Sequence, residues 1–153
     1  MKGRILIIFL LAFLGCENTK TSQEPVYDQA LAEQLGADEM GMKNYTLVIL
    51  KTGPAVIEDK ALRDSLFAGH FSNMSKMSDA GKLILAGPLA QNEQTYRGIF
   101  ILDTISEEEI RELLSGDPTI ANGIFEVELF TWYGSAALPS YLEVQKKIQK
   151  QEL

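Results

Sequence analysis

The stretch from Ala68 to Pro88 reads AGHFSNMSKMSDAGKLILAGP and carries the clearest structural signal of the chain. It combines the end of an amphipathic helix, a glycine stop and a short apolar strand that ends at Gly-Pro. His70, the only histidine of the 153 residues, falls on the apolar face of that helix. Two interpretations are open: a histidine packed in the core, or a group that binds a ligand or catalyses a reaction.

The helix that contains His70 is expected from Lys60 to about Gly81. Its apolar positions recur at steps of three and four residues, which is the helical period. Those positions are Leu62, Leu66, His70, Met74 and Met77.

Four segments have the composition of strands, and a second helix lies between the last two of them. Ser106 is a suitable N-cap for this helix, and acidic residues in its first turn suit the helix dipole. The order of elements is strand, helix, strand, strand, helix, strand, which predicts an α+β fold of the ferredoxin-like type with an antiparallel sheet. The strands are expected at residues 45–51, 82–86, 96–103 and 124–133, and the second helix at 107–115.

The last of these strands alternates, and it therefore presents two different faces. Glu126 and Glu128 share one face with Phe130 and Trp132. The two predicted helices cover the other face, and no helix of the monomer is expected over this one. A face that is half apolar needs a cover, so we expect a homodimer that packs through Phe130 and Trp132.

The N-terminus has the pattern of a secretory signal peptide. Lys2 and Arg4 precede an unbroken apolar run at 5–14, which is too short to span a bilayer as a helix. The run ends in FLGC, which resembles the lipobox of bacterial lipoproteins, in which the cysteine is lipidated. We therefore expect lipidation of Cys16, with palmitate or a similar acyl chain. The alternatives are an ordinary signal peptide that carries a cysteine, or a buried apolar helix.

The chain is expected to divide into four parts. A lipoprotein signal peptide covers residues 1–15, and a polar tether covers 16–42. The folded α+β domain covers 43–138, and a charged C-terminal helix covers 139–153.

Composition excludes several classes of function. The chain carries 14 basic and 21 acidic side chains, a net charge of −7, and loss of Lys2 and Arg4 with the signal peptide would make it more acidic. Nucleic-acid partners need a basic surface, so none is expected. A Cys/His metal site is excluded by the count of one Cys and one His. No nucleotide fingerprint is present, and we expect no cofactor.

Two segments together resemble the YciI-like (YCII-related) family. They are HFSNMSKMSDAGKLILAGPL and SGDPTIANGIFEVELFTWYG, at 70–89 and 115–134. The family combines a helical histidine, a G-K-L-x-x-A-G-P run, a later D-P and a strand that ends in an aromatic residue. The resemblance implies a dimeric α+β barrel, in which two four-stranded sheets pack face to face.

The resemblance also implies a site. It assigns the family's His–Asp pair to His70 and Asp117. Imidazole takes and returns a proton near neutral pH, and a carboxylate can fix its tautomer. Relatives of known activity act on small aromatic or lactone compounds by proton abstraction, isomerisation or loss of halide. The simpler interpretation of Asp117, in Gly-Asp-Pro, is a turn residue that holds backbone amides.

Four further residues are candidates for binding a substrate. Gly87 and Pro88 end a strand, and their lack of bulk would also let a ligand approach. Tyr96 and Arg97 could clamp an anionic substrate, although an arginine at a strand end is more simply a solvated residue.

Three classes of function remain open at this point. The chain is a small-molecule lyase or isomerase that uses His70 and Asp117, a module that binds a small ligand without catalysis, or a structural dimerisation domain. In each case we expect it in the bacterial cell envelope, lipid-anchored to a membrane with the domain on the extracytoplasmic side.

Overall fold

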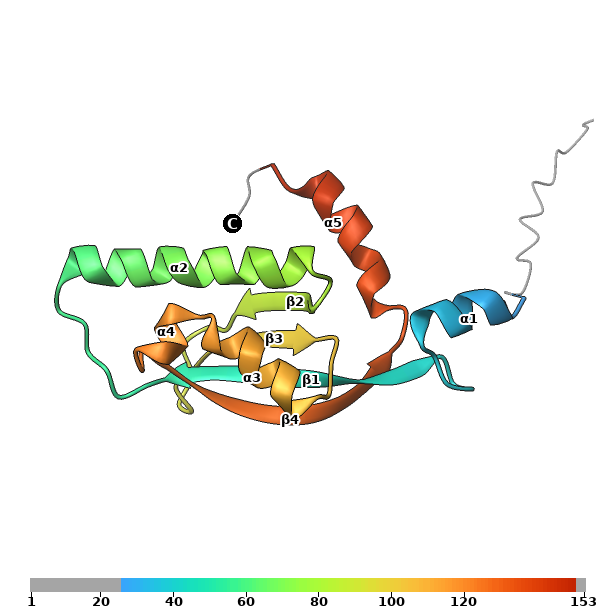
Figure 1. Ribbon diagram of the computed structural model, residues 1–153, viewed down its shortest axis with the longest axis horizontal. Coiled ribbons are helices and arrows are strands. Elements are labelled where there is room, and N and C mark those ends of the chain that lie inside the picture. The colour runs from blue at the N-terminus through green and yellow to red at the C-terminus, as the bar shows by residue number, and fades with distance from the viewer. Residues whose placement is uncertain (1–25, 151–153) are drawn as a thin grey trace, which may run out of the picture.

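The computed structural model describes residues 26–150 as an α+β fold around one four-stranded antiparallel sheet (Figure 1). The strand order is β2-β3-β1-β4, which confirms the predicted ferredoxin-like arrangement. The apolar β1 lies inside the sheet and pairs with both β3 and β4. The strands are β1 (Met42–Thr52), β2 (Leu83–Pro88), β3 (Tyr96–Leu102) and β4 (Phe125–Ser135).

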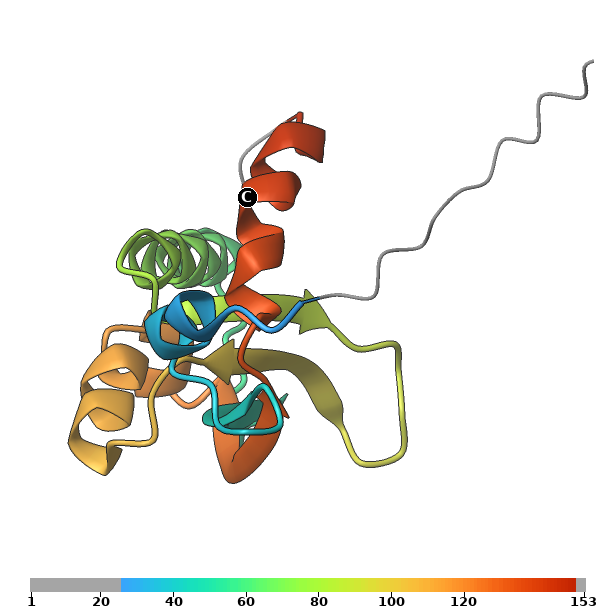
Figure 2. The same ribbon diagram turned by 90° about the vertical axis from the view of Figure 1, so that its right-hand side faces the viewer.

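Three helices lie together on one side of the sheet (Figure 2). The Asp59 carboxylate caps the first of them, and the predicted Ser106 cap accepts a hydrogen bond from the Glu109 backbone N–H. The third, a single turn, was not predicted, because the sequence pattern of Gly-Asp-Pro indicates a turn rather than the start of a helix. Asp117 instead caps a new helix that has Pro118 at its first position. The helices are α2 (Lys60–Asp79), α3 (Glu107–Ser115) and α4 (Pro118–Ala121).

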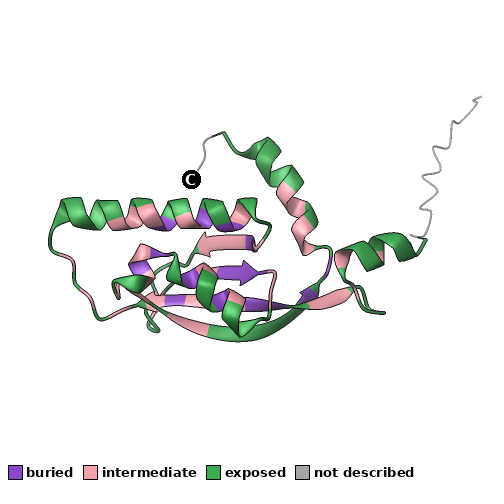
Figure 3. Ribbon diagram, in the orientation of Figure 1, coloured by how far each residue is buried: buried purple, intermediate pink, exposed green. Residues whose placement is uncertain are grey.

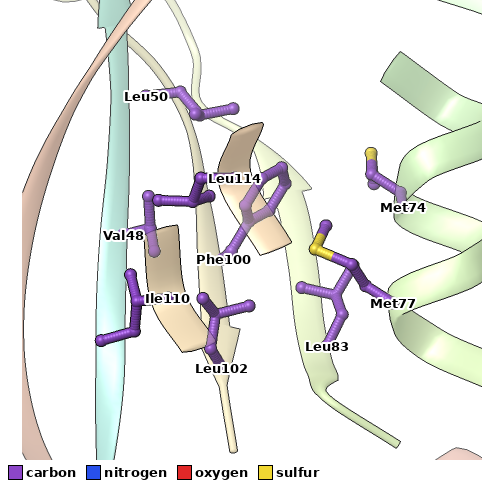
Figure 4. Packing of buried hydrophobic residues seen from close by; sticks show 9 residues of the cluster. All are labelled: Val48, Leu50, Met74, Met77, Leu83, Phe100, Leu102, Ile110 and Leu114. Atoms are coloured by element: carbon purple, nitrogen blue, oxygen red, sulfur yellow. The ribbon is translucent and has the colours of Figure 1, made fainter. Parts of the chain in front are cut away.

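The main core fills the space between these helices and the sheet (Figure 4). Met77 of α2 extends towards Phe100 and Leu83, while Ile110 and Leu114 of α3 lie near β1. Buried residues accordingly gather in β1 and β3, whereas much of β4 is exposed (Figure 3). The core thus fixes the sheet-facing side of α2, on which His70 also lies.

The C-terminal segment covers one end of the opposite sheet face, which corrects the expectation that no helix of the monomer reaches it. It forms η1 (Leu138–Tyr141) and α5 (Leu142–Ile148). These pack on a small cluster made by Tyr45, Ile84 and Ile101. The Tyr141 hydroxyl donates to the Ile84 carbonyl oxygen at 2.6 Å, so α5 stands beside the edge strand β2 (Figure 1).

The rest of that sheet face stays open. Phe130 is 48% exposed and Trp132 is 36% exposed. The ring of Trp132 lies against Tyr45, with ring centroids 5.6 Å apart. Phe130 and Trp132 therefore form an apolar surface that no other segment of residues 26–150 covers.

The segment before the sheet contains a short helix, α1 (Gln29–Leu35), within the stretch expected as a tether. Asp28 caps its start, and Gly36 ends it in the left-handed conformation. The predicted signal peptide and Cys16 lie outside the described residues. None of the helices within 26–150 combines the length and the apolar character needed to cross a membrane.

Helices α2 and α4 approach each other closely at Gly69. A Cβ atom at this position would lie 2.5 Å from Cγ of Pro118, nearer than real Cβ contacts allow. Asn73, one turn further on, donates to the Leu113 carbonyl oxygen at 3.1 Å. The absence of a side chain at Gly69 therefore brings Asp117, the residue before Pro118, up to α2.

Gly69→Ala should destabilise the protein by about 1–2 kcal/mol. The overpacking cost of about 1–3 kcal/mol exceeds the gain of up to about 1 kcal/mol from alanine in a helix. Urea unfolding measures the change. Gly87→Ala is the matched control, because a Cβ at Gly87 meets nothing within 4 Å. An alanine at position 69 that leaves stability unchanged would contradict the close packing.

Candidate active site

His70 is buried on the sheet-facing side of α2 and contacts Asp117. Its side chain is 8% exposed, and its Nδ1 lies 2.5 Å from Oδ2 of the carboxylate. Together with Met74 and Met77 it forms the buried face of α2. The structure thus brings together the two residues that the family resemblance paired, across the junction of α2 and α4.

Asp117 holds its position through Thr119. The backbone N–H and the hydroxyl of Thr119 both donate to Oδ1 of Asp117, at 2.9 and 2.6 Å. Oδ2 remains for His70. Both Asp117 and Thr119 are completely buried, so this carboxylate is fixed by its role as the cap of α4.

The electrostatics favour an ionised Asp117. Burial, the largest single influence, raises the pKa of this carboxyl group. The hydrogen bonds from His70 and Thr119 together outweigh burial, and the pKa of Asp117 lies below its ordinary value. An ionised carboxylate accepts only, so Nδ1 of His70 carries a proton and donates it.

The other ring nitrogen of His70, Nε2, is left for a ligand. It makes no hydrogen bond within residues 26–150. Every fully buried side-chain nitrogen and oxygen in that range has a hydrogen-bond partner, so an atom without a partner, such as Nε2, is not fully buried. Nε2 is therefore not sealed in the core. With Nδ1 protonated, the lone pair of a neutral imidazole lies on Nε2.

Four phenylalanine rings surround the imidazole. Their centroids lie between 5.4 and 6.3 Å from that of His70, and three of the four meet it edge-on. These rings give the imidazole apolar neighbours on several sides. They are Phe67, Phe71, Phe100 and Phe125.

A cavity of about 420 Å³ opens beside His70 and the four rings. Gly87, Pro88 and Arg97, three of the residues predicted to bind a substrate, line it together with Gly98. A Cβ atom at Gly98 would lie 2.9 Å from the Gly87 carbonyl oxygen, so the absence of a side chain there lets β2 and β3 approach closely at the wall of the cavity. Two larger hollows, of about 570 and 550 Å³, lie elsewhere, and His70 lines neither.

Tyr96 is separated from this cavity, which corrects the predicted clamp of Tyr96 and Arg97. The pairing of β1 with β3 shifts register between Leu50 and Lys51, so that Tyr96 lies opposite Lys51. The Tyr96 hydroxyl donates to Glu128 at 3.0 Å, and Glu128 is also ion-paired with Lys51 at 2.9 Å. A one-residue shift in a strand exchanges its faces, and nothing in the composition of 96–103 indicates such a shift.

Several residues of the site were missed in the sequence. Phe100 and Phe125 fall in predicted strands and Phe67 and Phe71 in the predicted helix at 60–81, and none of the four was a site candidate. Asp-Pro-Thr at 117–119 was a usable signal, because a capping aspartate often binds the N–H two residues on. Among the residues described, no three His, Cys, Asp or Glu side chains gather in a way that could hold a metal ion.

Replacing His70 by leucine should raise the pKa of Asp117, because it removes a hydrogen bond that lowers that pKa. A carboxyl group with a lowered folded-state pKa stabilises the fold above its unfolded pKa, near 3.8, and this contribution is lost as the pH falls through the folded-state value. In His70→Leu the loss should begin at higher pH. Carbon-detected NMR titration of the aspartates measures the shift.

Asp38 is the internal control for this titration. Its pKa is lowered chiefly by a hydrogen bond from Tyr133, and it does not contact His70. The Asp38 titration should be the same in both proteins. An unchanged Asp117 titration in His70→Leu would show that the two residues do not interact in solution.

Comparison with known proteins bears on the fold and the family. No curated protein matches the chain at a significant level. Among solved structures it is similar to 5-chloro-2-hydroxyhydroquinone dehydrochlorinase from Burkholderia phenoliruptrix AC1100, in complex with 2,5-dihydroxybenzoquinone. The identity is 19%, the TM-score is 0.44, and the match covers 57% of this chain and 92% of that chain. The pattern of the YCII-related domain matches residues 45–133, more than half of the chain, and the chain therefore belongs to the YCII-related domain family.

Proposed function

We propose that this protein catalyses proton transfer on a small molecule, as a lyase or isomerase, with His70 as general base and general acid. The observation that supports this most is the buried His70–Asp117 pair at 2.5 Å, placed at the wall of an aromatic cavity of about 420 Å³. A core histidine would need the partner for its N–H, but it would not need the cavity.

In the proposed reaction Nε2 of His70 removes a proton from a C–H or O–H of the substrate. The imidazole becomes an imidazolium, and the negative charge of Asp117 stabilises it. The electron pair left on the substrate either shifts a double bond or expels a leaving group. Nε2 then returns the proton, to another substrate atom in an isomerase or to the leaving group or solvent in a lyase, which restores the neutral ring.

Proton transfer can be detected before the natural substrate is known. In deuterated water the protein should introduce deuterium into members of a panel of lactones and hydroxylated aromatic compounds, followed by proton NMR. His70→Gln should lower the exchange rate by about a hundredfold or more, because general acid–base catalysis contributes that much. Arg111→Gln, an exposed change on α3, is the control.

Equal exchange rates in the native and His70→Gln proteins would rule out the proposed role. Binding of the panel compounds without any exchange would favour the second candidate, a module that binds small ligands without catalysis. The four phenylalanine rings around the cavity suit either role.

We also propose that the protein is a homodimer, joined through the sheet face that carries Phe130 and Trp132. Both side chains are exposed on a face that η1 and α5 cover only at one end. Light scattering on residues 26–153 should give twice the chain mass at micromolar concentration. Phe130→Glu should give the monomer mass, and Leu62→Glu, in the exposed first turn of α2, should leave the dimer intact. A native chain that stays monomeric contradicts the proposal.

The proposed location is the bacterial cell envelope, with Cys16 lipidated and the domain on the extracytoplasmic side of a membrane. The basic start, the short apolar run and Gly15-Cys16 support it. Cys16→Ser should move the protein from the membrane fraction to the soluble fraction, or leave it unprocessed. Membrane partition and mass that do not change on this substitution would contradict the anchor.

A further inference from the structure

Arg97 lines the cavity beside His70 because of an irregularity in the sheet. Gly98 of β3 pairs with Leu50, and the next pair along joins Tyr96 to Lys51, so that Arg97 has no partner on β1. A strand bulge of this kind re-aims side chains, and bulges are common next to active sites. Here the bulge places Tyr96 on the face of the sheet that carries Glu128, and Arg97 among the residues that line the cavity.

Thr52 and Thr95 hold the guanidinium in place. Nε of Arg97 donates to the hydroxyl of Thr52 at 2.5 Å, and that hydroxyl donates to the Thr95 carbonyl oxygen at 3.4 Å. Thr95 has a φ of 60°, which is a strained conformation for a β-branched residue. The Asn92 side chain keeps the turn in this shape, because its amide binds both the N–H and the carbonyl of Tyr96.

The charge of Arg97 is not neutralised by its neighbours. Within residues 26–150, no carboxylate lies within 4.0 Å of its guanidinium. Carboxylates are plentiful in a chain of net charge −7, but four of the five ion pairs in that range are made by lysines. Nε is bound to Thr52, and the Nη1 and Nη2 groups remain to donate. Asp117, the carboxylate of the site, is already occupied by His70 and Thr119.

We propose that Arg97 is the anion-binding residue of the His70 cavity, and that the cavity takes a flat, conjugated or aromatic compound with one anionic group. The four phenylalanine rings provide apolar surfaces for a flat ligand. The guanidinium provides two parallel N–H donors, which match the two oxygens of a carboxylate. This inference rests on the proposed function for the site but concerns binding, and Thr52 acts in it as a positioning residue.

The test compares benzoate with benzamide, which have the same shape and differ in charge. His70 is the only histidine, so its ring signals report binding of each compound to the full chain in detergent by NMR titration. The native protein should bind benzoate about tenfold more tightly than benzamide. Arg97→Gln should abolish this preference and leave benzamide binding unchanged, and Arg97→Lys should keep part of the preference.

Thr52→Val keeps the charge of Arg97 but removes the hydroxyl that holds Nε, so the preference for benzoate should fall by less than in Arg97→Gln. Thr52→Ser should restore the preference, which a purely structural role would not predict. Arg111→Gln, away from this cavity, should change nothing.

Three outcomes would overturn the inference: equal binding of the two compounds, binding of neither at millimolar concentration, or a preference that survives Arg97→Gln. The proposed catalysis is tested separately, by the deuterium-exchange experiment. His70→Gln should keep the preference for benzoate, followed here by the broadening of the ligands' own proton signals because the histidine signal is absent, but it should lose deuterium exchange. A failure of catalysis and a failure of anion binding therefore give different results.

Discussion

The close approach of α2 and α4 is the contact on which the site depends. Gly69 has no side chain, and Pro118 occupies the space that one would need. The residue before that proline is the cap of α4, so its carboxylate is turned towards the helix that carries His70. A capping interaction, ordinarily a means of starting a helix, here also supplies the charged partner of a buried imidazole.

The sheet contributes to the site through its irregularities as well as through its regular pairing. Regular pairing of β1 with β4 gives the core its apolar layer at Val48 and Leu50. The bulge in β3 leaves Arg97 among the residues that line the cavity next to His70. Leu50 and Phe100 belong both to the core and to the lining of the cavity, so stability and binding share side chains of these strands.

The sequence predicted the parts of the structure that depend on local patterns. Alternation, helical period and the cap at Ser106 depend on neighbouring residues, and the structure has them. Where Tyr96 lies was not predictable, because one bulge reverses the faces of a strand without any change in composition. The docking of η1 and α5 was missed for a similar reason, since contacts between Tyr141 and Ile84 join residues far apart in the chain. The pairing of His70 with Asp117 followed from the family resemblance, not from any pattern of the residues alone.

The hydroxyl of Tyr141 on the carbonyl oxygen of Ile84 has a consequence for how this chain meets other chains. An edge strand offers unpaired backbone groups to any extended segment that comes near, which is a route to aggregation. On β2 the carbonyl oxygen of Ile84 is already hydrogen-bonded, and α5 lies beside the strand, where it hinders the approach of another segment. At high protein concentration this edge is therefore less accessible to a pairing segment than a bare edge strand would be.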